Sequence, residues 1–587
     1  MSVTNGWSWE RRQAGARIAF ATALAGFGAM ALGPAVSPMV ASAGGAPTAV
    51  IVRGSAASGQ AAENLVARLG GRVGRHLGMI DGFAAVVNAN DVGRLRATPG
   101  VMEVSVDAPL QLTSLVNGYD QTTDSASLYS TAETTGARSY WNHGFTGKGV
   151  DVALIDSGVV PVNGLTTPGK VINGPDLSFD SQVPGRTYLD AYGHGTHMAG
   201  IIAGRDDAVV AGSAYAYDKT NFIGIAPDSR VVNVKVADSG GAVDVSQVIA
   251  GIDWVVQHRT DNGMNIRVLN LSFGTDSTQP YVLDPLAFAA EVAWRNGIVV
   301  VAAVGNGGSA ALGVSDPASD PYVIAVGAAD TNGTVSPSDD SPAGFSASGN
   351  GARNPDLLAP GVHIASLRNP GSTIDQQFGG TATVGGRFFR GSGTSQATAV
   401  MSGAAALVIS QHPAYTPDMV KRLLTKTATP LTYTNGGLLG LGLLATTTAY
   451  PAIQQGSGEL NLRSAGSNSV STLYKQTWAP SQGTGTLQGA RGSLRVTDSD
   501  SGISLTGEKD IFGSSFNSAA MAQLEAAGQS WSGGTWNGQT WSGQSWSGQS
   551  WSGQSWSGQS WSGQSWSGQS WSGQSWSGQS WSEADWS

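Results

Sequence analysis

Short apolar runs alternate with longer helical patterns through the middle of the chain. The runs are continuously hydrophobic, as expected of parallel strands that are buried on both faces. They lie at residues 150–155, 232–236, 268–271 and 298–301. Apolar residues recur with helical spacing at residues 245–257, 283–295 and 416–426. This alternation predicts an α/β domain with a doubly wound, mostly parallel sheet sandwiched by helices, which we place at residues 130–462.

Residues 47–107 have a different pattern of shorter elements. Strand patterns occupy residues 49–53, 72–79, 83–88 and 101–106, and helical patterns occupy residues 61–69 and 89–97. The order βαββαβ predicts a small ferredoxin-like α+β module. An independent α/β module is the alternative interpretation. The polar stretch 111–135 that follows is predicted to be a linker in which the chain is processed.

Residues 1–43 have the pattern of a secretory signal peptide. Three arginines precede a mostly apolar stretch at residues 18–40, and Ala-Ser-Ala at residues 41–43 forms a cleavage site of the A-x-A type. An uncleaved membrane anchor is the alternative, because the apolar stretch is long for a signal. No other segment is apolar enough to span a bilayer. We therefore expect a secreted protein that is extracellular or associated with the cell surface.

The end of the chain changes composition. Residues 463–528 are rich in Ser, Gly and Thr, which is typical of a linker or a small accessory segment. In residues 529–587 a tryptophan recurs every five positions from Trp531 to Trp586. With a spacing of five residues, the tryptophans would not lie on one side of a helix, and they would not lie on one side of a strand either. We interpret this repeat either as a multivalent tail that binds cell-wall polysaccharide or as an inert flexible extension.

Composition excludes several kinds of chemistry. The chain has 587 residues and no cysteine, so it has neither disulfides nor a catalytic thiol. Its formal net charge is -9, and removing residues 1–43, which hold three Arg and one Glu, makes the charge -11. An acidic protein of this kind has no general attraction to nucleic acid.

Three short segments far apart in the chain carry the residues of one catalytic constellation. VALIDSGV contains Asp156, GHGTHMAG contains His194 and GTSQATAV contains Ser395. A serine hydroxyl becomes a nucleophile when a base takes its proton and a third group fixes that base. Asp156 falls at the end of a predicted strand, and Ser395 falls at the start of a predicted helix at residues 397–408, where the helix dipole favours an oxyanion.

These segments resemble the subtilisin-like serine peptidases, the subtilases, over residues 137–462. The resemblance implies an endopeptidase with Asp156, His194 and Ser395 as its triad. AAVGN at residues 302–306 matches the place of the family's oxyanion-hole asparagine, so Asn306 and the backbone N–H of Ser395 are expected to bind the tetrahedral intermediate. Gln396 and the alanine at position 399 depart from the family's usual Met and Pro, and neither side chain performs the chemistry.

The resemblance also implies where substrate binds. Subtilases hold a peptide as an extra strand between two edges, and the matching edges are Ser272, Phe273, Gly274 and Ser239, Gly240, Gly241. The pocket for the residue before the scissile bond would have Phe273 and residues 302–305, including Ala303 and Gly305, as its walls, with Ser315 near its base. No acidic cluster stands out there, so the expected preference is broad or apolar rather than dibasic.

The same resemblance suggests further roles. The module at residues 47–107 would be an inhibitory propeptide that occupies the cleft of its own catalytic domain, and protein or peptide substrates would be the other partners. The chemistry requires no cofactor. Calcium is a candidate structural ion, with Asp206, Asp207 and Asp218 as candidate ligands in the loop at residues 205–220. The alternative function is a surface-binding protein whose Trp-rich tail attaches it to wall polymer and whose peptidase domain serves self-processing.

Overall fold

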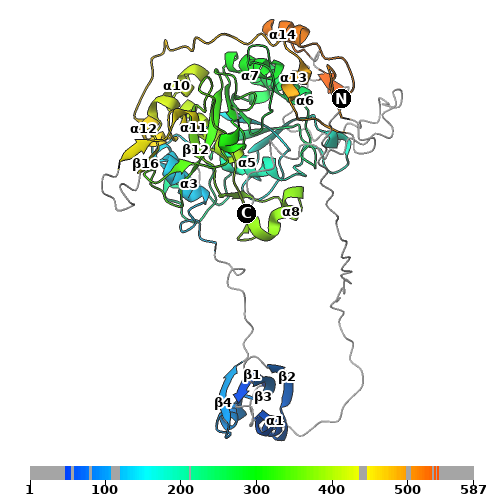
Figure 1. Cartoon of the computed structure of the whole chain (residues 1–587), viewed down its shortest axis with the longest axis vertical. Helices are drawn as coiled ribbons and strands as arrows, with labels where there is room; N and C mark the ends of the chain where they lie inside the picture. The colour runs from blue at the N-terminus through cyan, green and yellow to red at the C-terminus, as the bar shows by residue number, and fades with distance from the viewer. Residues whose placement is uncertain are drawn as a thin grey trace, which may run out of the picture. The chain divides into compact units, whose positions relative to one another are not determined.

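The computed structural model describes residues 47–54, 59–77, 82–106, 119–209, 213–311, 313–434, 446–497, 504–531, 535–536 and 539–540. The chain forms two compact units that divide after Leu112. The first is the small unit in blue in Figure 1, and the second contains the remaining elements. The predicted signal peptide and the repeat beyond residue 540 lie outside the described residues.

The N-terminal unit has the predicted βαββαβ order. Its four strands form an antiparallel sheet in the order β2-β3-β1-β4. The elements are β1 (Pro47–Gly54), α1 (Gly59–Arg68), β2 (Arg72–Leu77), β3 (Gly82–Asn88), α2 (Val92–Arg96) and β4 (Val101–Val106). Val50, Val52, Val66 and Leu95 are fully buried and join strands to helices in one apolar core. The ferredoxin-like prediction is therefore confirmed.

The second unit is built on the predicted parallel sheet. The strands follow the order β11-β10-β9-β8-β5-β7-β6, with β12 also paired to β10, and only β11 runs antiparallel to its neighbour. They are β5 (Asp151–Asp156), β6 (Val171–Asp176), β7 (Arg230–Lys235), β8 (Ile266–Leu271), β9 (Val299–Ala303), β10 (Ile324–Asp330), β11 (Ser341–Pro342) and β12 (Leu357–Pro360). Every residue of β5 and β9 is buried, which explains the continuously apolar runs.

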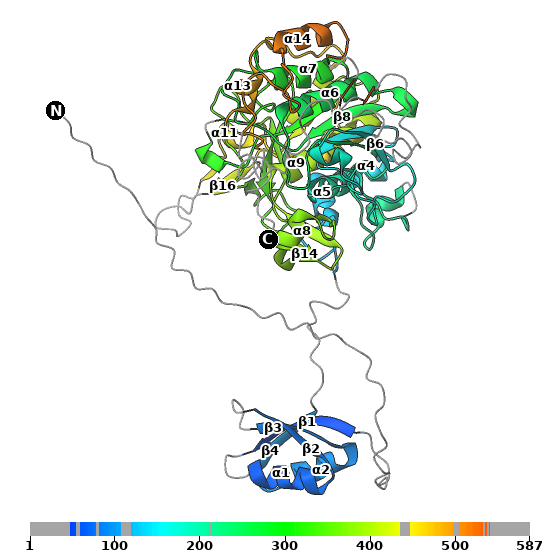
Figure 2. The same cartoon turned by 90° about the vertical axis from the view of Figure 1, so that its right-hand side faces the viewer.

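Helices cover the sheet in two packed pairs. α5 (His194–Ala203) packs against α9 (Thr394–Gln411), and α6 (Val245–His258) packs against α7 (Pro285–Arg295). Two of the three predicted catalytic motifs belong to the first pair (Figure 2), since α5 begins at His194 and α9 begins one residue before Ser395. Smaller elements complete the unit: α8 (Thr373–Ala382), α10 (Pro417–Thr427), α11 (Ala452–Gln455), α12 (Leu462–Gly466), β13 (Ile364–Leu367), β14 (Thr383–Val384), β15 (Phe388–Gly391), β16 (Thr432–Thr434), β17 (Thr447–Ala449), β18 (Thr535–Trp536) and β19 (Gln539–Thr540).

The predicted processing linker is shorter than expected. From residue 119 onward the chain belongs to the second unit, and it forms α3 (Leu128–Thr135) and α4 (Ala137–Asn142). The Ser127 side chain caps α3, and Gly136, in the left-handed region with φ 81°, ends it. The predicted domain start at residue 130 therefore falls inside a helix. The polar side chains that suggested a linker are mostly threonines and serines that bond back to their own helix or its cap.

The segment after residue 462 is not a free linker. It packs on the second unit with α13 (Leu487–Arg491) and α14 (Ser518–Ala526), which lie beside α6 and α7 (Figures 1 and 2). Its buried apolar side chains belong to the main hydrophobic core, among them Leu487, Leu494, Val496, Leu505, Phe516 and Met521. Trp531, the first tryptophan of the repeat, contacts Phe516 edge to face with ring centroids 5.2 Å apart. Within the described part of the chain, no helix has the length and hydropathy needed to cross a membrane.

One buried ion pair anchors this segment. The guanidinium of Arg491 donates to both carboxylate oxygens of Asp244, at 2.6 and 3.2 Å, and also to the carbonyls of Gly507 and Lys509. Both side chains of the pair are about 1% exposed. Asp244 is also the N-cap of α6, where it accepts from the backbone N–H of Ser246. The pair thus joins the C-terminal segment to a helix of the central domain.

We expect Arg491→Met to destabilise the second unit by about 3 to 5 kcal/mol, because it leaves the Asp244 carboxylate buried without its cation. The measurement is urea unfolding in a Ser395→Ala background, which avoids self-digestion. Arg463→Met is the matched control, because Arg463 and its partner Glu133 are both nearly half exposed and such pairs contribute about 0 to 1 kcal/mol. Equal losses in the two variants would show that Arg491 is not an anchor.

Candidate active site

The strand β5 presents Asp156 to the first residue of α5. Both carboxylate oxygens of Asp156 lie within hydrogen-bonding distance of His194 Nδ1, at 2.9 and 3.0 Å. Asp156 and His194 are 0% and 1% exposed. Gly193 precedes the helix at φ 112°, a backbone conformation that a side chain would strain. This contact makes Nδ1 a donor and leaves Nε2 as the basic nitrogen of the imidazole.

Ser395 is the second residue of α9, and its contacts fix it beside β8. Its hydroxyl donates to the carbonyl oxygen of Ser272 at 2.8 Å, and the Ser272 hydroxyl donates back to the Ser395 carbonyl at 3.1 Å. Asn270 in turn donates to the Ser272 hydroxyl at 2.8 Å. A backbone N–H in the first turn of a helix has no carbonyl partner within that helix, so the Ser395 N–H suits an oxyanion.

Asn306 follows β9 and is tied to the residue before Ser395. Its Oδ1 accepts from the backbone N–H and the hydroxyl of Thr394, both at 2.9 Å. Because a backbone N–H can only donate, the amide oxygen must face Thr394, and the NH2 group is directed elsewhere. Asn306 also lines the cavity described below. The arrangement is what a side-chain donor of an oxyanion hole requires.

A buried carboxylate that the sequence analysis missed connects these parts. Asp190 accepts from the Ser157 hydroxyl at 2.7 Å, from the Gly193 N–H at 2.6 Å and from the Thr196 N–H at 2.7 Å. The Ser157 hydroxyl also lies 3.2 Å from Asp156 Oδ1. Burial raises the pKa of Asp190, while its hydrogen bonds lower it. Asp190 thus links the strand that carries Asp156 to the helix that carries His194.

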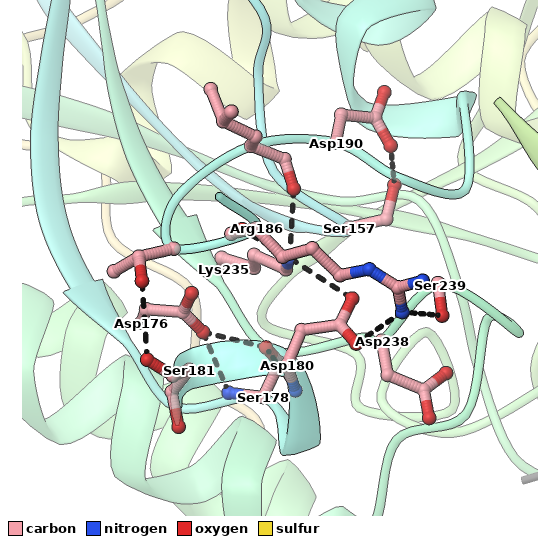
Figure 3. Close-up of polar contacts among 12 residues, drawn as sticks. Ser157, Asp176, Ser178, Asp180, Ser181, Arg186, Asp190, Lys235, Asp238 and Ser239 are labelled. Carbon is pink, nitrogen blue, oxygen red and sulfur yellow. Dashed lines mark hydrogen bonds and ion pairs between the residues drawn. The ribbon is translucent and has the colours of Figure 1, made fainter. Parts of the chain in front are cut away.

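The loop that ends in Asp190 is held by a buried lysine (Figure 3). Lys235 lies opposite Asp156 in the register of β7 and β5, and its side chain is 0% exposed. Its ammonium donates to the carbonyls of Arg186 and Leu189, at 3.0 and 2.7 Å, and pairs with Asp180 at 3.3 Å. Figure 3 shows these contacts beside the bond from Ser157 to Asp190. Buried hydrogen bonds and one ion pair therefore hold the loop that positions Asp190 beside Ser157.

A cavity of about 460 Å³ opens beside Asn306. Four residues that were predicted to contact substrate line it: Gly274 from the predicted edge, and Val304, Gly305 and Ser315 from the predicted pocket. A Cβ at Gly274 would collide with the Ser315 hydroxyl, so glycine allows the two walls to approach. Sequence reasoning missed most of the other lining residues, which are Thr275, Asp276, Ser277, Gly307, Ala310, Ala311, Gly313, Val314, Ala347 and Leu494. Leu494 lies 147 positions after Ala347, the lining residue nearest to it in the chain, so no local pattern could have indicated it.

The remaining predicted substrate residues lie elsewhere. Phe273 and Ala303 are 1% and 3% exposed; Phe273 belongs to the hydrophobic core, and neither side chain lines the described cavity. The expectation that they form pocket walls is corrected accordingly. Ser239 accepts from Arg186, and the Asp238 carboxylate accepts the N–H groups of Gly240 and residue 242. The segment Ser239, Gly240, Gly241 therefore forms a tight turn.

The candidate calcium ligands each have protein partners. Asp206 pairs with Arg387, Asp207 accepts from two threonine hydroxyls, and Asp218 accepts from Thr220 and the next residue. Among the described residues, no group of three or more acidic or histidine side chains is arranged to hold a metal. Residues 210–212 of this loop are not among the residues that the structure describes.

The fold and the site together define a serine hydrolase with an Asp-His-Ser order on a doubly wound α/β sheet. Comparison with known proteins agrees with this class, because residues 147–459 match the Subtilase family. Residues 31–107 match a peptidase inhibitor domain. The chain belongs to the subtilase family and is a serine endopeptidase. The inhibitor match begins before the predicted signal cleavage site at residues 41–43.

Individual relatives show the extent of the likeness. Serine protease AprX of Bacillus subtilis is 39% identical over 285 residues, which are 48% of this chain and 61% of that protein. Subtilisin E of the same organism is 32% identical over 399 residues, 66% of this chain and 86% of that protein. Subtilisin Savinase of Lederbergia lenta is 35% identical over 304 residues, 52% of this chain and 91% of that protein.

We expect Asp190→Asn to lower kcat by about 10- to 100-fold with little change in KM, because misplacement of catalytic groups costs about that much. The amide offers one acceptor oxygen where the carboxylate serves three donors, so Asp156 and the start of α5 lose their common anchor. Steady-state kinetics on a small peptide substrate measure the effect. Asp207→Asn is the control, because Asp207 accepts from threonine hydroxyls near the surface. A proportional change in KM alone would contradict the positioning role.

The pH dependence distinguishes the two histidines of α5. Burial, together with the neighbouring His194, lowers the pKa of His197 to about 3, so His197 is neutral above about pH 4. A general base acts only when unprotonated, so activity falls when an imidazole gains a proton at acid pH. We expect His197→Gln to retain this acid limb at an unchanged position, because the variant removes no charge. We expect His194→Ala to lose activity at every pH. The reverse pattern would show that the base has been misassigned.

Proposed function

We propose that this endopeptidase hydrolyses peptide bonds in protein substrates through an acyl-enzyme formed on Ser395. The observation that carries the proposal is the contact of Asp156, the last residue of β5, with His194 Nδ1, together with Ser395 in the first turn of α9. Ser395 Oγ attacks the carbonyl carbon while His194 accepts its proton. His194 then gives that proton to the leaving amine, and water hydrolyses the ester by the same route in reverse.

In this scheme, two hydrogen-bond donors stabilise the negative charge on the oxygen of the tetrahedral intermediate. The NH2 group of Asn306 and the backbone N–H of Ser395 supply them. This role of Asn306 is supported by the two hydrogen bonds that Thr394 donates to its amide oxygen, because they orient the side-chain amide. Loss of an equivalent asparagine in subtilisin costs about 100- to 1000-fold in turnover.

The chain is made as a self-processing precursor in our proposal. The N-terminal unit folds as the expected βαββαβ module and matches a peptidase inhibitor domain, which supports a role as inhibitor of the attached enzyme. Secretion is inferred from the signal-like pattern at residues 1–43. The first peptide bond to be cut would lie between the two units, before residue 119. The preference for apolar side chains is inferred from the glycine, alanine, valine and leucine in the cavity wall.

Two predictions from sequence stay predictions. The Trp-rich repeat lies almost entirely outside the described residues, so its role in binding cell-wall polysaccharide and the alternative of a surface-binding protein rest on composition. Structural calcium likewise rests on the loop at residues 205–220. None of these roles is needed for the proposed reaction.

We expect Ser395→Ala to accumulate with its two units still joined, because the variant lacks the nucleophile and changes little volume. Asn306→Ala should be processed slowly rather than not at all, since the Ser395 N–H still holds the oxyanion. The measurement is the mass of the protein over time after expression without residues 1–43 in a host that lacks extracellular peptidases. Wild-type protein under the same conditions is the control. Cleavage of Ser395→Ala at the wild-type site and rate would show that another enzyme processes the chain.

A further inference from the structure

The C-terminal segment runs alongside one wall of the cavity. Residues 275–277 are part of that wall, and residues 278 and 279 continue the chain from it. Residues 486–493 of the C-terminal segment lie against this stretch. Thr275 donates its hydroxyl to the Ala490 carbonyl at 2.6 Å, and Thr278 donates its N–H to the Gly489 carbonyl at 3.2 Å. The amide of Gln279 both donates to the Thr486 carbonyl, at 2.8 Å, and accepts the Thr486 N–H, at 3.0 Å. The two segments are thus joined by bonds along their whole length.

Contacts continue beyond the cavity. Gln482 and Gly485 donate their N–H groups to the carbonyls of Val282 and Leu283, at 2.8 and 2.6 Å. Tyr281 donates its hydroxyl to the carbonyl of residue 479 at 2.9 Å. The chain from residue 275 to residue 283 therefore has the C-terminal segment as its neighbour throughout. Because this chain continues directly from Gly274 in the cavity wall, the segment supports that wall.

Leu494 enters the cavity itself. Its side chain is 9% exposed and lines the same space as Asn306, Gly305 and Ser315. Ala311 and Val314, which also line the cavity, pack on the hydrophobic cluster that contains Leu494. Leu494 lies 35 positions beyond residue 459, where the match to the Subtilase family ends. This apolar contact is therefore supplied by a part of the chain that the family match does not include.

The residue before Leu494 donates two hydrogen bonds to Asp276, the one acidic side chain among the residues that line the cavity. Asp276 accepts the backbone N–H of Ser493 at 2.7 Å and its hydroxyl at 2.5 Å. Gly492, at φ 59°, allows this approach, since a Cβ there would collide with Asp276. With both oxygens occupied, Asp276 is a poor partner for a cationic substrate side chain. The segment thus contributes an apolar surface and a hydrogen bond to each carboxylate oxygen of Asp276.

We propose that residues 492–494 form one wall of the pocket for the substrate residue before the scissile bond, and that Leu494 limits the size of the side chain accepted there. The proposal rests on the proposed function, because it assigns the cavity beside Asn306 to that residue. Arg491 holds the segment from behind through its buried pair with Asp244. The wall is therefore fixed in place rather than free to open.

The test compares Leu494→Ala and Leu494→Trp with Leu505→Ala. Leu505 is the matched control, because it is 7% exposed, belongs to the same cluster and segment, and does not line the cavity of the described residues. The readout is the ratio of kcat/KM for peptides with Phe or Leu before the scissile bond. We expect Leu494→Ala to raise the Phe:Leu ratio about tenfold and Leu494→Trp to lower it about tenfold, the discrimination that small volume changes give in apolar pockets. Leu505→Ala should leave the ratio unchanged.

Two further arms keep a negative result interpretable. Labelling of Ser395 by a serine-directed phosphonate reports whether the catalytic site is intact, so an unlabelled wild-type enzyme would count against the proposed function. Normal labelling with an unchanged Phe:Leu ratio in both Leu494 variants would overturn the present inference. In the Ser395→Ala background, calorimetric affinities for the same peptides should shift in the same direction, which tests the wall without catalysis. An equal ratio change in Leu505→Ala would show general loosening and would also overturn it.

Charge supplies a second readout. Ser493→Ala removes the hydroxyl donor from Asp276 and leaves the N–H in place, so part of the carboxylate becomes available to the cavity. We expect kcat/KM for an Arg substrate to rise several-fold relative to Leu in this variant. The double variant Ser493→Ala with Asp276→Asn should return to the wild-type ratio. A rise that persists without the Asp276 carboxylate would contradict the assignment of Asp276 to this wall.

Discussion

The site depends on one carboxylate that is held inside a dry core. Asp156 has no exposed surface, and burying such a group costs several kcal/mol unless donors replace the lost water. His194 Nδ1 and the Ser157 N–H, at 2.7 Å, are those donors. Asp190 in turn accepts from the Ser157 hydroxyl and from the N–H groups of Gly193 and Thr196, on either side of His194 at the start of α5. The geometry of the triad is therefore set by a chain of buried polar groups, and the apolar sheet provides the rigid frame around them.

A second group of buried acids lies behind the cavity. Burial, together with Asp284, raises the pKa of Asp316 well above its usual range, and burial with Glu291 raises that of Asp320 to about 7. Because the folded chain holds the Asp320 proton more tightly than the unfolded chain, this carboxyl favours folding at acid pH and loses that contribution as pH rises towards 7. The Arg353 guanidinium donates to the Asp320 carbonyl and to those of residues 318 and 323. In a chain without cysteine, such bonds take the place of covalent links in fixing the loop beyond Ser315.

Local patterns were enough to predict the sheet and to indicate the segments that carry Asp156, His194 and Ser395. The apolar runs of β5, β7, β8 and β9 are buried on both faces, so their sequences carry the signal directly, and the motifs around Asp156, His194 and Ser395 are each contiguous. Asp190 was missed although it lies four residues before His194, because a lone carboxylate in a loop has no distinguishing neighbours in sequence. Leu494 had no local signal at all, since its role comes from a contact between distant segments.

The composition of the C-terminal segment left open whether it is a linker or a small accessory segment, and its packing fits the second. Its abundant Ser, Gly and Thr indicate a chain that cannot form a core alone, yet it covers a surface that already exists and satisfies its backbone by bonding to residues 275–283. Arg491 fixes the register of that contact. A buried ion pair gives little net stability over an apolar pair of the same size, but it tolerates few other alignments because an unpaired partner is so costly. Asp244 is the N-cap of α6, so this single pair links the segment that bears Leu494 to the start of that helix. The pocket is thus held in shape without a disulfide.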